Sequence, residues 1–260
     1  FSRAYEGDID MENLLINKEP YKGLLPDGLP VPSSTIISGE GGSGKPLVGL
    51  QFVSSWLESG GSVLFVLTSM RKDFIISIMD RLYSTELGDY EDAVRYLKLN
   101  PGLQGGEVDE GEGLRAANLL VPEVWDRELS LAVTELSSGH PGTLVFGAAL
   151  NLFLFSPTYA DVIHKKFREA VESPGPESYL FTVATSAYRE KIRELEESCD
   201  NLFYTYMEEM GSLDLELRKI AGKERERERI SVPLTRESLV EIKEMAESGK
   251  RQLVPAIRKN

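Results

Sequence analysis

The sequence predicts an α/β fold in which a mainly parallel, twisted sheet is flanked by helices and continues into an antiparallel C-terminal extension. Apolar runs of strand length alternate with segments of helical periodicity up to about residue 197. A glycine cluster separates the first such strand from the first helix. After residue 200, alternating segments follow one another with only turn-like or charged stretches between them, which is typical of antiparallel hairpins.

The first half of the core combines two strands with two helices. We expect strands at 34–38 and 63–67 and helices at 47–56 and 74–82. Gly60 and Gly61 end the first helix, because glycine terminates helical runs. The acidic, glycine-rich stretch 103–113 predicts a solvated loop, and its composition is also compatible with disorder.

The second half continues the alternation and then becomes antiparallel. The expected elements are helices at 122–136, 159–171 and 188–197, strands at 143–148 and 179–184, and antiparallel strands at 202–207, 213–220 and 230–234. Pro122 suits the first turn of its helix. The longest apolar run, 144–155, is much shorter than the roughly 20 residues of a membrane span, so we expect a buried strand and no membrane partner.

Composition excludes several classes of protein. The 260 residues include 41% hydrophobic ones and suffice for a sizeable core, so a repeat array or disulfide mini-protein is excluded. Cys199, His140 and His164 cannot form an internal disulfide or a familiar zinc site. The net charge of −13 opposes attraction to phosphate backbones, so we expect no nucleic-acid partner. The expected organisation is an N-terminal arm (1–24), a core domain (25–242) and a C-terminal tail (243–260).

The most informative motif is a glycine-rich loop between the first strand and the first helix. Residues 39–45 fit the pattern G-x-x-x-x-G-K in the strand–loop–helix context that this motif requires. In such a loop, backbone N–H groups surround phosphate oxygens, the lysine meets the outer phosphates, and the helix N-terminus favours negative charge. The predicted nucleotide-binding residues are Gly39, Glu40, Gly41, Gly42, Ser43, Gly44, Lys45 and Pro46.

Pro46 departs from the motif, which requires Ser or Thr at this position as a magnesium ligand. Proline has neither a hydroxyl nor a backbone N–H, and it biases Lys45 away from α geometry. Each lost donor to a charged phosphate weakens binding by roughly 1–3 kcal/mol. We therefore expect weakly bound ATP or ADP and no magnesium.

The segment 29–38, the glycine loop and the segment 61–66 together resemble the ATPase core of the RecA, RadA and KaiC group. The resemblance extends from about Leu25 to Ile242. It implies a RecA-like P-loop NTPase core, in which ATP lies between neighbouring subunits of a ring or filament.

The resemblance also identifies missing catalytic groups. KaiC-like proteins end the second core strand with two glutamates, one of which activates water; Ser69 and Met70 stand here. Another core strand of the family ends in an aspartate that helps to hold magnesium, where this chain has Gly147. The polar residue that senses the γ-phosphate corresponds to Thr185 or Ser186. Losing several positioned charges together predicts a pseudo-ATPase.

Two further segments resemble contacts between family subunits. A Lys-x-Arg-Gly sequence reaches the adjacent subunit's nucleotide in KaiC-like proteins; here Lys219 remains while Ala221 replaces the arginine. Lys219 is thus a candidate trans-acting residue, or else a solvent-facing strand residue. Phe1 and Ala4 match a Phe-x-x-Ala peptide that docks on a neighbouring RadA-like subunit, and a frayed terminus is the alternative.

Charge patterning indicates protein rather than nucleic-acid partners. Residues 1–200 contain 17 basic and 31 acidic residues, whereas 201–260 contain 12 and 11, so complementary surfaces for head-to-tail association are available. The segment 223–229 alternates in sign and predicts a polar edge ribbon or an exposed hairpin tip. The basic residues Arg189, Lys191 and Arg193 are neutralised by neighbouring glutamates, which favours a solvated helix face over a DNA site.

These observations lead to one functional hypothesis and two alternatives. We expect a catalytically inactive RecA/KaiC-like domain, a cytoplasmic regulatory or protein-interaction module with a vestigial nucleotide-binding loop and no metal site. One alternative is an active ATPase in which another carboxylate, such as Glu40, replaces the missing ones. The other is a recombinase-paralogue mediator that binds a recombinase or single-stranded DNA.

Overall fold

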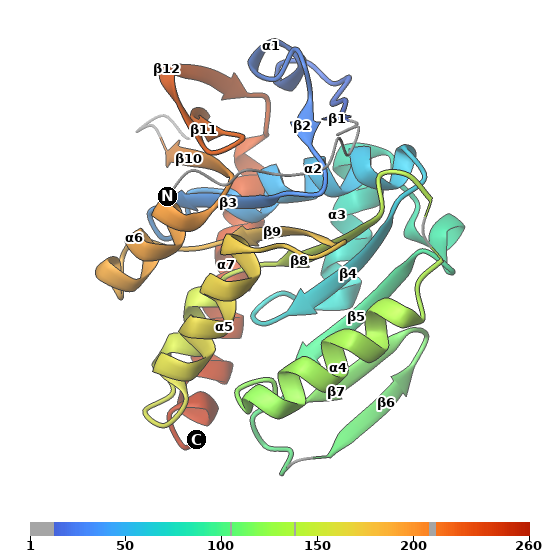
Figure 1. The fold of residues 1–260 in the computed structure, drawn as a ribbon, viewed down its shortest axis with the longest axis vertical. Coiled ribbons are helices and arrows are strands. Elements are labelled where there is room, and N and C mark those ends of the chain that lie inside the picture. Colours follow the sequence, from blue (N-terminus) through green and yellow to red (C-terminus); the bar gives the residue numbers. More distant parts are fainter. Residues whose placement is uncertain (1–12, 105, 138, 208–211) are drawn as a thin grey trace.

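The computed structural model describes residues 13–260 except 105, 138 and 208–211 (Figure 1). The strands are β1 (Asn13–Leu14), β2 (Leu29–Pro30), β3 (Ser34–Gly39), β4 (Ser62–Leu67), β5 (Val94–Leu99), β6 (Glu107–Gly111), β7 (Leu114–Ala117), β8 (Thr143–Gly147), β9 (Ser178–Thr182), β10 (Asn201–Met207), β11 (Leu213–Ile220) and β12 (Lys223–Val232). The helices are α1 (Tyr21–Leu24), α2 (Lys45–Glu58), α3 (Lys72–Tyr83), α4 (Pro122–Thr134), α5 (Ala160–Glu172), α6 (Arg189–Ser198) and α7 (Arg236–Ile257), with 3₁₀ turns η1 (Leu87–Tyr90) and η2 (Leu150–Phe155).

A ten-stranded sheet forms the centre of the fold, in the order β12-β11-β10-β3-β9-β8-β4-β5-β7-β6. Neighbouring strands from β10 to β7 are parallel. Strands β11 and β12 extend one edge with antiparallel pairs, and β6 pairs antiparallel with β7 at the other edge. The predicted α/β class, the mostly parallel sheet and the antiparallel C-terminal strands are thus confirmed.

Helices cover both faces of the sheet, with α4, α5 and α6 in front and α2 and α3 behind (Figure 1). Strand β4 shows how the two faces of a central strand are buried against different helices. Its residues Val63, Phe65 and Leu67 pack in the cluster that contains α2 and α3, whereas Leu64 and Val66 pack in the cluster of α4, α5 and α6. Because both faces are covered, the central strands are continuous apolar runs.

The stretch 103–113 differs from its prediction as a solvated loop, because most of it belongs to a hairpin. Strand β6 pairs with β7, and Asp109 lies opposite Arg115. All of β6 is exposed, so its sequence has no alternation of apolar and polar residues that would indicate a strand. Strand β5, which the sequence interpretation omits, joins this hairpin to β4.

The apolar run 144–155 was expected to be a buried strand, and that prediction is wrong beyond Gly147. Ala149 adopts a left-handed conformation with φ 54°, and η2 then turns the chain. A buried 3₁₀ turn has the same apolar composition as a strand, so composition alone cannot separate them. Among the described residues, no helix is long and apolar enough to cross a bilayer.

Helix α7 crosses from one face of the sheet to the other. The Thr235 side chain caps its N-terminus by accepting a hydrogen bond from the Ser238 N–H at 3.2 Å. Leu239 packs in the cluster of α2 and α3, whereas Val254 and Ile257 pack in the cluster of α4, α5 and α6. Residues on both sides of the expected boundary at 242 therefore form one helix.

Close packing of α2 on the sheet requires a glycine, and this gives a first prediction. A Cβ atom at Gly49 would lie 2.6 Å from Phe146 Cε2, inside the contact distance. Gly49→Ala is therefore expected to lower the free energy of unfolding by about 1–3 kcal/mol, measured by urea denaturation. Gly88→Ala is the matched control, since nothing lies within 4 Å of a Cβ there. Equal stabilities of the two variants would contradict this packing.

Candidate functional site

A cavity of about 300 Å³ lies at the carboxyl ends of the parallel strands, between the glycine loop and α7. Ligands of open α/β sheets bind at this edge because the loops that follow the strands converge there. Strands β3, β4, β8 and β9 contribute their following residues. The polar and charged residues that line the cavity are Ser43, Lys45, Ser69, Asn151, Thr182, Ser186, Lys243, Glu247 and Lys250.

The glycine loop owes its curvature to residues that lack a side chain. Gly39, at the end of β3, has φ 151°, and a Cβ there would lie 2.5 Å from Thr205 Oγ1. Gly42 and Gly44 have φ values of 77° and 67°, which other residues rarely adopt. The loop therefore turns tightly from the strand into α2.

The loop presents free backbone donors at the start of α2. The amides of Gly41, Gly42, Gly44 and Lys45 donate to no acceptor within the described part of the chain. Pro46 is the second residue of α2 and has no N–H of its own. Free N–H groups and the helix dipole together make this end of α2 favourable for an anion.

Lys45 is a buried cation without a carboxylate beside it. Its side chain is 5% exposed, and Nζ donates to Gly39 O at 3.2 Å, to Ser43 Oγ at 3.0 Å and to Glu40 O. Burial lowers the pKa of Lys45 to about 7, while the Glu40 carboxylate partly opposes this shift. No described carboxylate lies within 4 Å of Nζ, so the ammonium lacks the anion that a buried charge requires.

The residues at the expected catalytic positions have structural surroundings of their own. Ser69 lines the cavity, whereas Met70 is buried in the apolar core. A Cβ atom at Gly147 would lie 2.8 Å from Leu150 Cδ2 and 3.1 Å from Phe181 Cδ1. An aspartate at the end of β8 would therefore collide with η2, so the glycine also serves packing.

Of the two candidate sensor residues, Ser186 lies at the cavity. Its Oγ would be 3.6 Å from a Cβ at Gly41. Thr185 faces away, with Oγ1 3.4 Å from Tyr204 OH, and its N–H donates to Gly39 O at 2.9 Å. The loop and the end of β9 are thus joined directly.

Sequence reasoning missed the contribution of α7 and η2 to this cavity. The Lys243 side chain lies over Gly42, with Cγ and Cδ 3.6 Å from the position of a Cβ there. Gly249 packs so closely on Ser69 that a Cβ would be 2.8 Å from Ser69 Cα. Lys243, Glu247 and Lys250 are spaced along one face of a helix, a signal that the expected boundary at 242 concealed.

The carboxylate at the cavity is Glu247 rather than Glu40. Glu40 is exposed and is not among the residues that line the cavity, whereas Glu247 is the one acidic side chain among them. No group of three or more His, Cys, Asp or Glu side chains suited to a metal occurs in the described chain. The groups at the cavity are therefore mainly lysine side chains and backbone N–H groups, which bind anions rather than metal ions.

Lys219 is occupied within the chain. It is 7% exposed, and Nζ donates to Glu196 O and Glu197 O at 2.9 Å and to Cys199 O at 3.1 Å. These carbonyls belong to the C-terminal end of α6, where a cation is favourable. The trans-acting role stays a prediction, and Phe1 and Ala4 lie outside the described residues.

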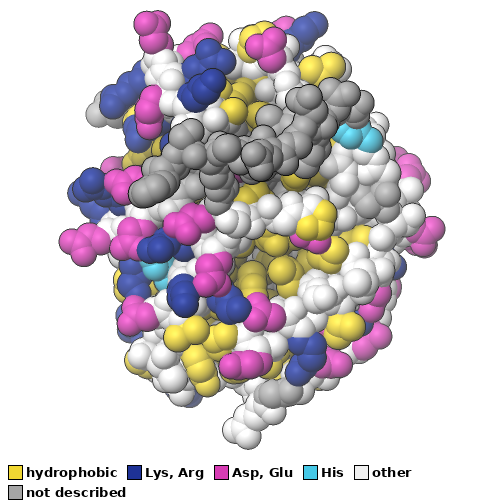
Figure 2. Space-filling model, in the orientation of Figure 1, with side chains coloured by type: hydrophobic (Ala, Val, Ile, Leu, Met, Phe, Trp, Pro, Cys, Tyr) yellow, Lys and Arg dark blue, Asp and Glu magenta, His cyan; other side chains and the backbone are white. Residues whose placement is uncertain are grey.

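The two charged segments of the sequence belong to β12 and α6. Strand β12 is the outer strand of the sheet, and its exposed residues 223–229 begin directly after the turn from β11, so the segment is both an edge strand and one arm of a hairpin; its contact with a partner stays a prediction. On α6, Arg193 pairs with Glu197 at 2.7 Å and Lys191 pairs with Asp161. Figure 2 shows both signs of charge mixed on this side of the molecule.

His164 is buried, and its Nε2 lies 2.9 Å from Lys191 O.

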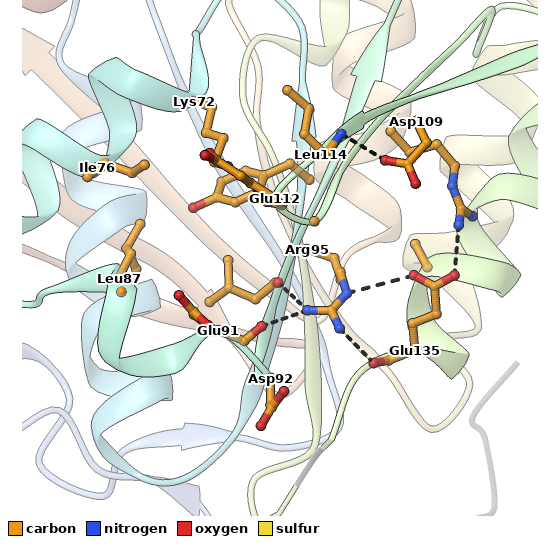
Figure 3. Close-up of a pocket in the computed structure, with 17 residues that line it drawn as sticks. Lys72, Ile76, Leu87, Glu91, Asp92, Arg95, Asp109, Glu112, Leu114 and Glu135 are labelled. Carbon is orange, nitrogen blue, oxygen red and sulfur yellow. Dashed lines mark hydrogen bonds and ion pairs between the residues drawn. The ribbon is translucent and has the colours of Figure 1, made fainter.

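A second, larger cavity of about 840 Å³ lies near α3, β5 and the β6–β7 hairpin (Figure 3). Each basic side chain that lines it has an acidic partner. Lys72 pairs with Glu112 at 3.0 Å, and Arg115 pairs with Glu135 at 2.7 Å. Arg95 Nε lies 3.7 Å from the same Glu135 carboxylate. The larger cavity therefore lacks the uncompensated positive charge that characterises the smaller one.

The position of Lys219 gives a second prediction. Lys219→Ala removes the donor of three hydrogen bonds to carbonyls at the end of α6 and is expected to lower the free energy of unfolding by about 2 kcal/mol. Urea denaturation measures the loss. Lys223→Ala, on the exposed start of β12, is the control that should change little. A Lys219→Ala variant as stable as that control would exclude the capping role.

A scan against protein-family models and a search of the curated proteins found no match for this chain. Its function is therefore inferred from the residues of the loop and the cavity.

Proposed function

We propose that this protein binds the phosphate groups of ATP or ADP at the loop 39–45 without hydrolysing them, as a RecA/KaiC-like regulatory or interaction module. The observation that carries the proposal is the buried Lys45 ammonium at the N-terminus of α2. It lacks an anionic partner and is surrounded by backbone amides that have no acceptor in the described chain. A phosphate group supplies both the missing charge and the missing acceptors.

The strand order supports the RecA-like part of the proposal. The loop follows a strand in the middle of a parallel sheet, and the cavity lies outside the carboxyl ends of that sheet. Binding of a ligand at this place is general for open α/β folds. The specific relation to RecA and KaiC rests on the motif and segment order in the sequence.

The side chains around the loop support binding without turnover. Phosphoryl transfer depends on a positioned base, a metal ligand and charges that stabilise the transition state. Pro46 and Gly147 provide no oxygen ligand, and Ser69 replaces a carboxylate with a weakly basic hydroxyl. A nucleotide bound here would act by changing the conformation of the protein and its binding to partners.

The exposed edges of the sheet support the interaction role. Strand β12 is outermost on one side and carries Arg225 and Arg227, while β6 is outermost on the other and carries Glu107 and Asp109. Both strands are largely exposed, and neither pairs on its outer side with another strand of the described residues. Head-to-tail association of copies, or pairing with a protein partner, is the use that we propose for them.

Glu247 favours a second candidate function, an active ATPase. It is the acidic side chain that lines the cavity, and it lies on α7 opposite the loop. In such an enzyme it would take the role of general base. This candidate predicts ATP hydrolysis that disappears in Glu247→Gln.

Calorimetric titration of the whole chain with ATP and ADP, with and without magnesium, tests the main proposal. Lys45→Ala is expected to weaken binding at least about tenfold, because it removes a charge-assisted contact to phosphate. Lys22→Ala, exposed on α1, is the control and should bind as the parent does. Equal binding by Lys45→Ala would refute the site, and turnover lost in both Lys45→Ala and Glu247→Gln would establish the enzyme instead.

The lowered pKa of Lys45 predicts a pH dependence of binding. An anion favours the charged ammonium, so affinity is complete below pH 7 and falls, by up to about tenfold per unit, as pH rises above it. The second ionisation of a phosphate, near pH 6, is by then largely complete. Titrations at pH 8 in buffers of different ionisation enthalpy should show uptake of about one proton. A flat affinity from pH 7 to pH 9 would contradict this role of Lys45.

A further inference from the structure

Helix α7 brings two lysines to the cavity, and neither is neutralised by the described residues around it. Lys243 has no ion pair or hydrogen bond to another described side chain. Lys250 lies 5.7 Å from the ring centroid of Phe155 and has no described carboxylate within 4 Å. Glu247, which lies between them in sequence, is 3.7 Å from Arg251 and so has a cation elsewhere on the helix.

Asn151 adds an uncharged donor to the same space. Its side chain lines the cavity and is 7% exposed. The Oδ1 atom accepts a hydrogen bond from the Ala184 N–H at 3.1 Å, and this contact fixes which end of the side-chain amide is oxygen and which is Nδ2. This Nδ2 donates to no other described residue. Because Asn151 lines the cavity, its Nδ2 is available to an acceptor there.

The charged lining of the cavity contrasts with the chain as a whole. Lys45, Lys243 and Lys250 face it together with a single acidic residue, Glu247, whereas the protein carries a net charge of −13. A concave space that gathers one sign of charge concentrates ions of the other sign. The cavity is therefore a positive site on an acidic protein.

We infer that Lys243 and Lys250 of α7, with Asn151 of η2, make this cavity a metal-independent site for a polyphosphate chain. The inference rests on the proposed function and deepens it. A divalent cation usually neutralises the outer phosphates of a nucleotide, and the lysines of α7 supply that charge from the chain itself. Lys45 and the loop amides bind one phosphate group of the ligand, and Lys243 and Lys250 of α7 bind the phosphate groups next to it. The ligand class includes ATP, ADP and inorganic polyphosphates.

The arrangement also explains why the loss of the magnesium ligand at Pro46 is compatible with a retained loop lysine. A site that relies on magnesium needs the hydroxyl that Pro46 removes. A site that relies on lysines does not need this hydroxyl. Pro46 and the two lysines of α7 line the same cavity.

The test uses the full chain and two probes, ATP and inorganic tripolyphosphate, each titrated in EDTA and in magnesium. The parent protein is expected to bind in EDTA at least as tightly as in magnesium. Lys243→Ala combined with Lys250→Ala should weaken binding in EDTA by about 30- to 100-fold, and each single change by about tenfold. Lys243→Arg combined with Lys250→Arg should restore most of the affinity. Lys259→Ala, an exposed lysine just beyond α7, is the matched control.

Hydrogen exchange separates a direct contact from a structural role of α7. Ligand binding should slow amide exchange in α7 of the parent protein and leave it unchanged in the double alanine variant. Thermal unfolding without ligand should be the same for the parent and for the Lys243 and Lys250 variants, since both side chains are exposed. Binding of ATP alone would assign the site to nucleotides, and equal binding of tripolyphosphate would assign it to the phosphate chain; both support the inference.

Failure of the α7 inference can be distinguished from failure of the proposed loop site. If Lys45→Ala loses binding while the double alanine variant binds as the parent does, the α7 inference is wrong and the proposed loop site stands. If binding needs magnesium, the inference is also wrong. If Lys45→Ala binds as the parent does, or no probe binds in either condition, both the inference and the proposed function are overturned.

Discussion

The hydrogen bonds of the Lys45 ammonium hold together the place where β3 ends and α2 begins. Nζ donates to Gly39 O, Glu40 O and Ser43 Oγ, so the cation closes the loop on itself. Ser43 Oγ is also 2.7 Å from Thr205 Oγ1, which ties the loop to β10. These hydrogen bonds fix the turn from β3 into α2, where the free amides and the cavity lie.

The position of α7 follows from the same edge of the sheet. Parallel strands send all their following loops to one side, and an edge so formed is rich in glycine and open backbone groups. Gly249 lets α7 approach the Ser69 backbone, and Lys243 then lies over Gly42. A helix that crosses this edge can bury its apolar ends in both cores while its middle carries cations to the cavity. This combination favours a polyphosphate ligand without a metal ion.

Gly147 and Met70, which stand where the resemblance predicts carboxylates, have a packing role. Gly147 is close to Leu150 and Phe181, and Met70 belongs to the apolar core. Both positions are therefore fitted to the side chains around them. A carboxylate introduced at either position would disturb that packing.

The sequence by itself determined the α/β class, the order of most strands and helices, and the glycine loop with Lys45, because local periodicity and a contiguous motif carry these features. It could not place β6, whose exposed residues lack alternation, or η2, whose composition equals that of a strand. Only the tertiary structure decided that α7 crosses the loop, that Lys219 caps α6, and that Asn151, Lys243 and Lys250 meet Lys45 at one cavity. At the cavity, Asn151, Lys243 and Lys250 are about 100 to 200 positions from Lys45, and Lys219 is 20 to 23 positions from its partners on another element, so the geometry depends on packing that no local pattern encodes.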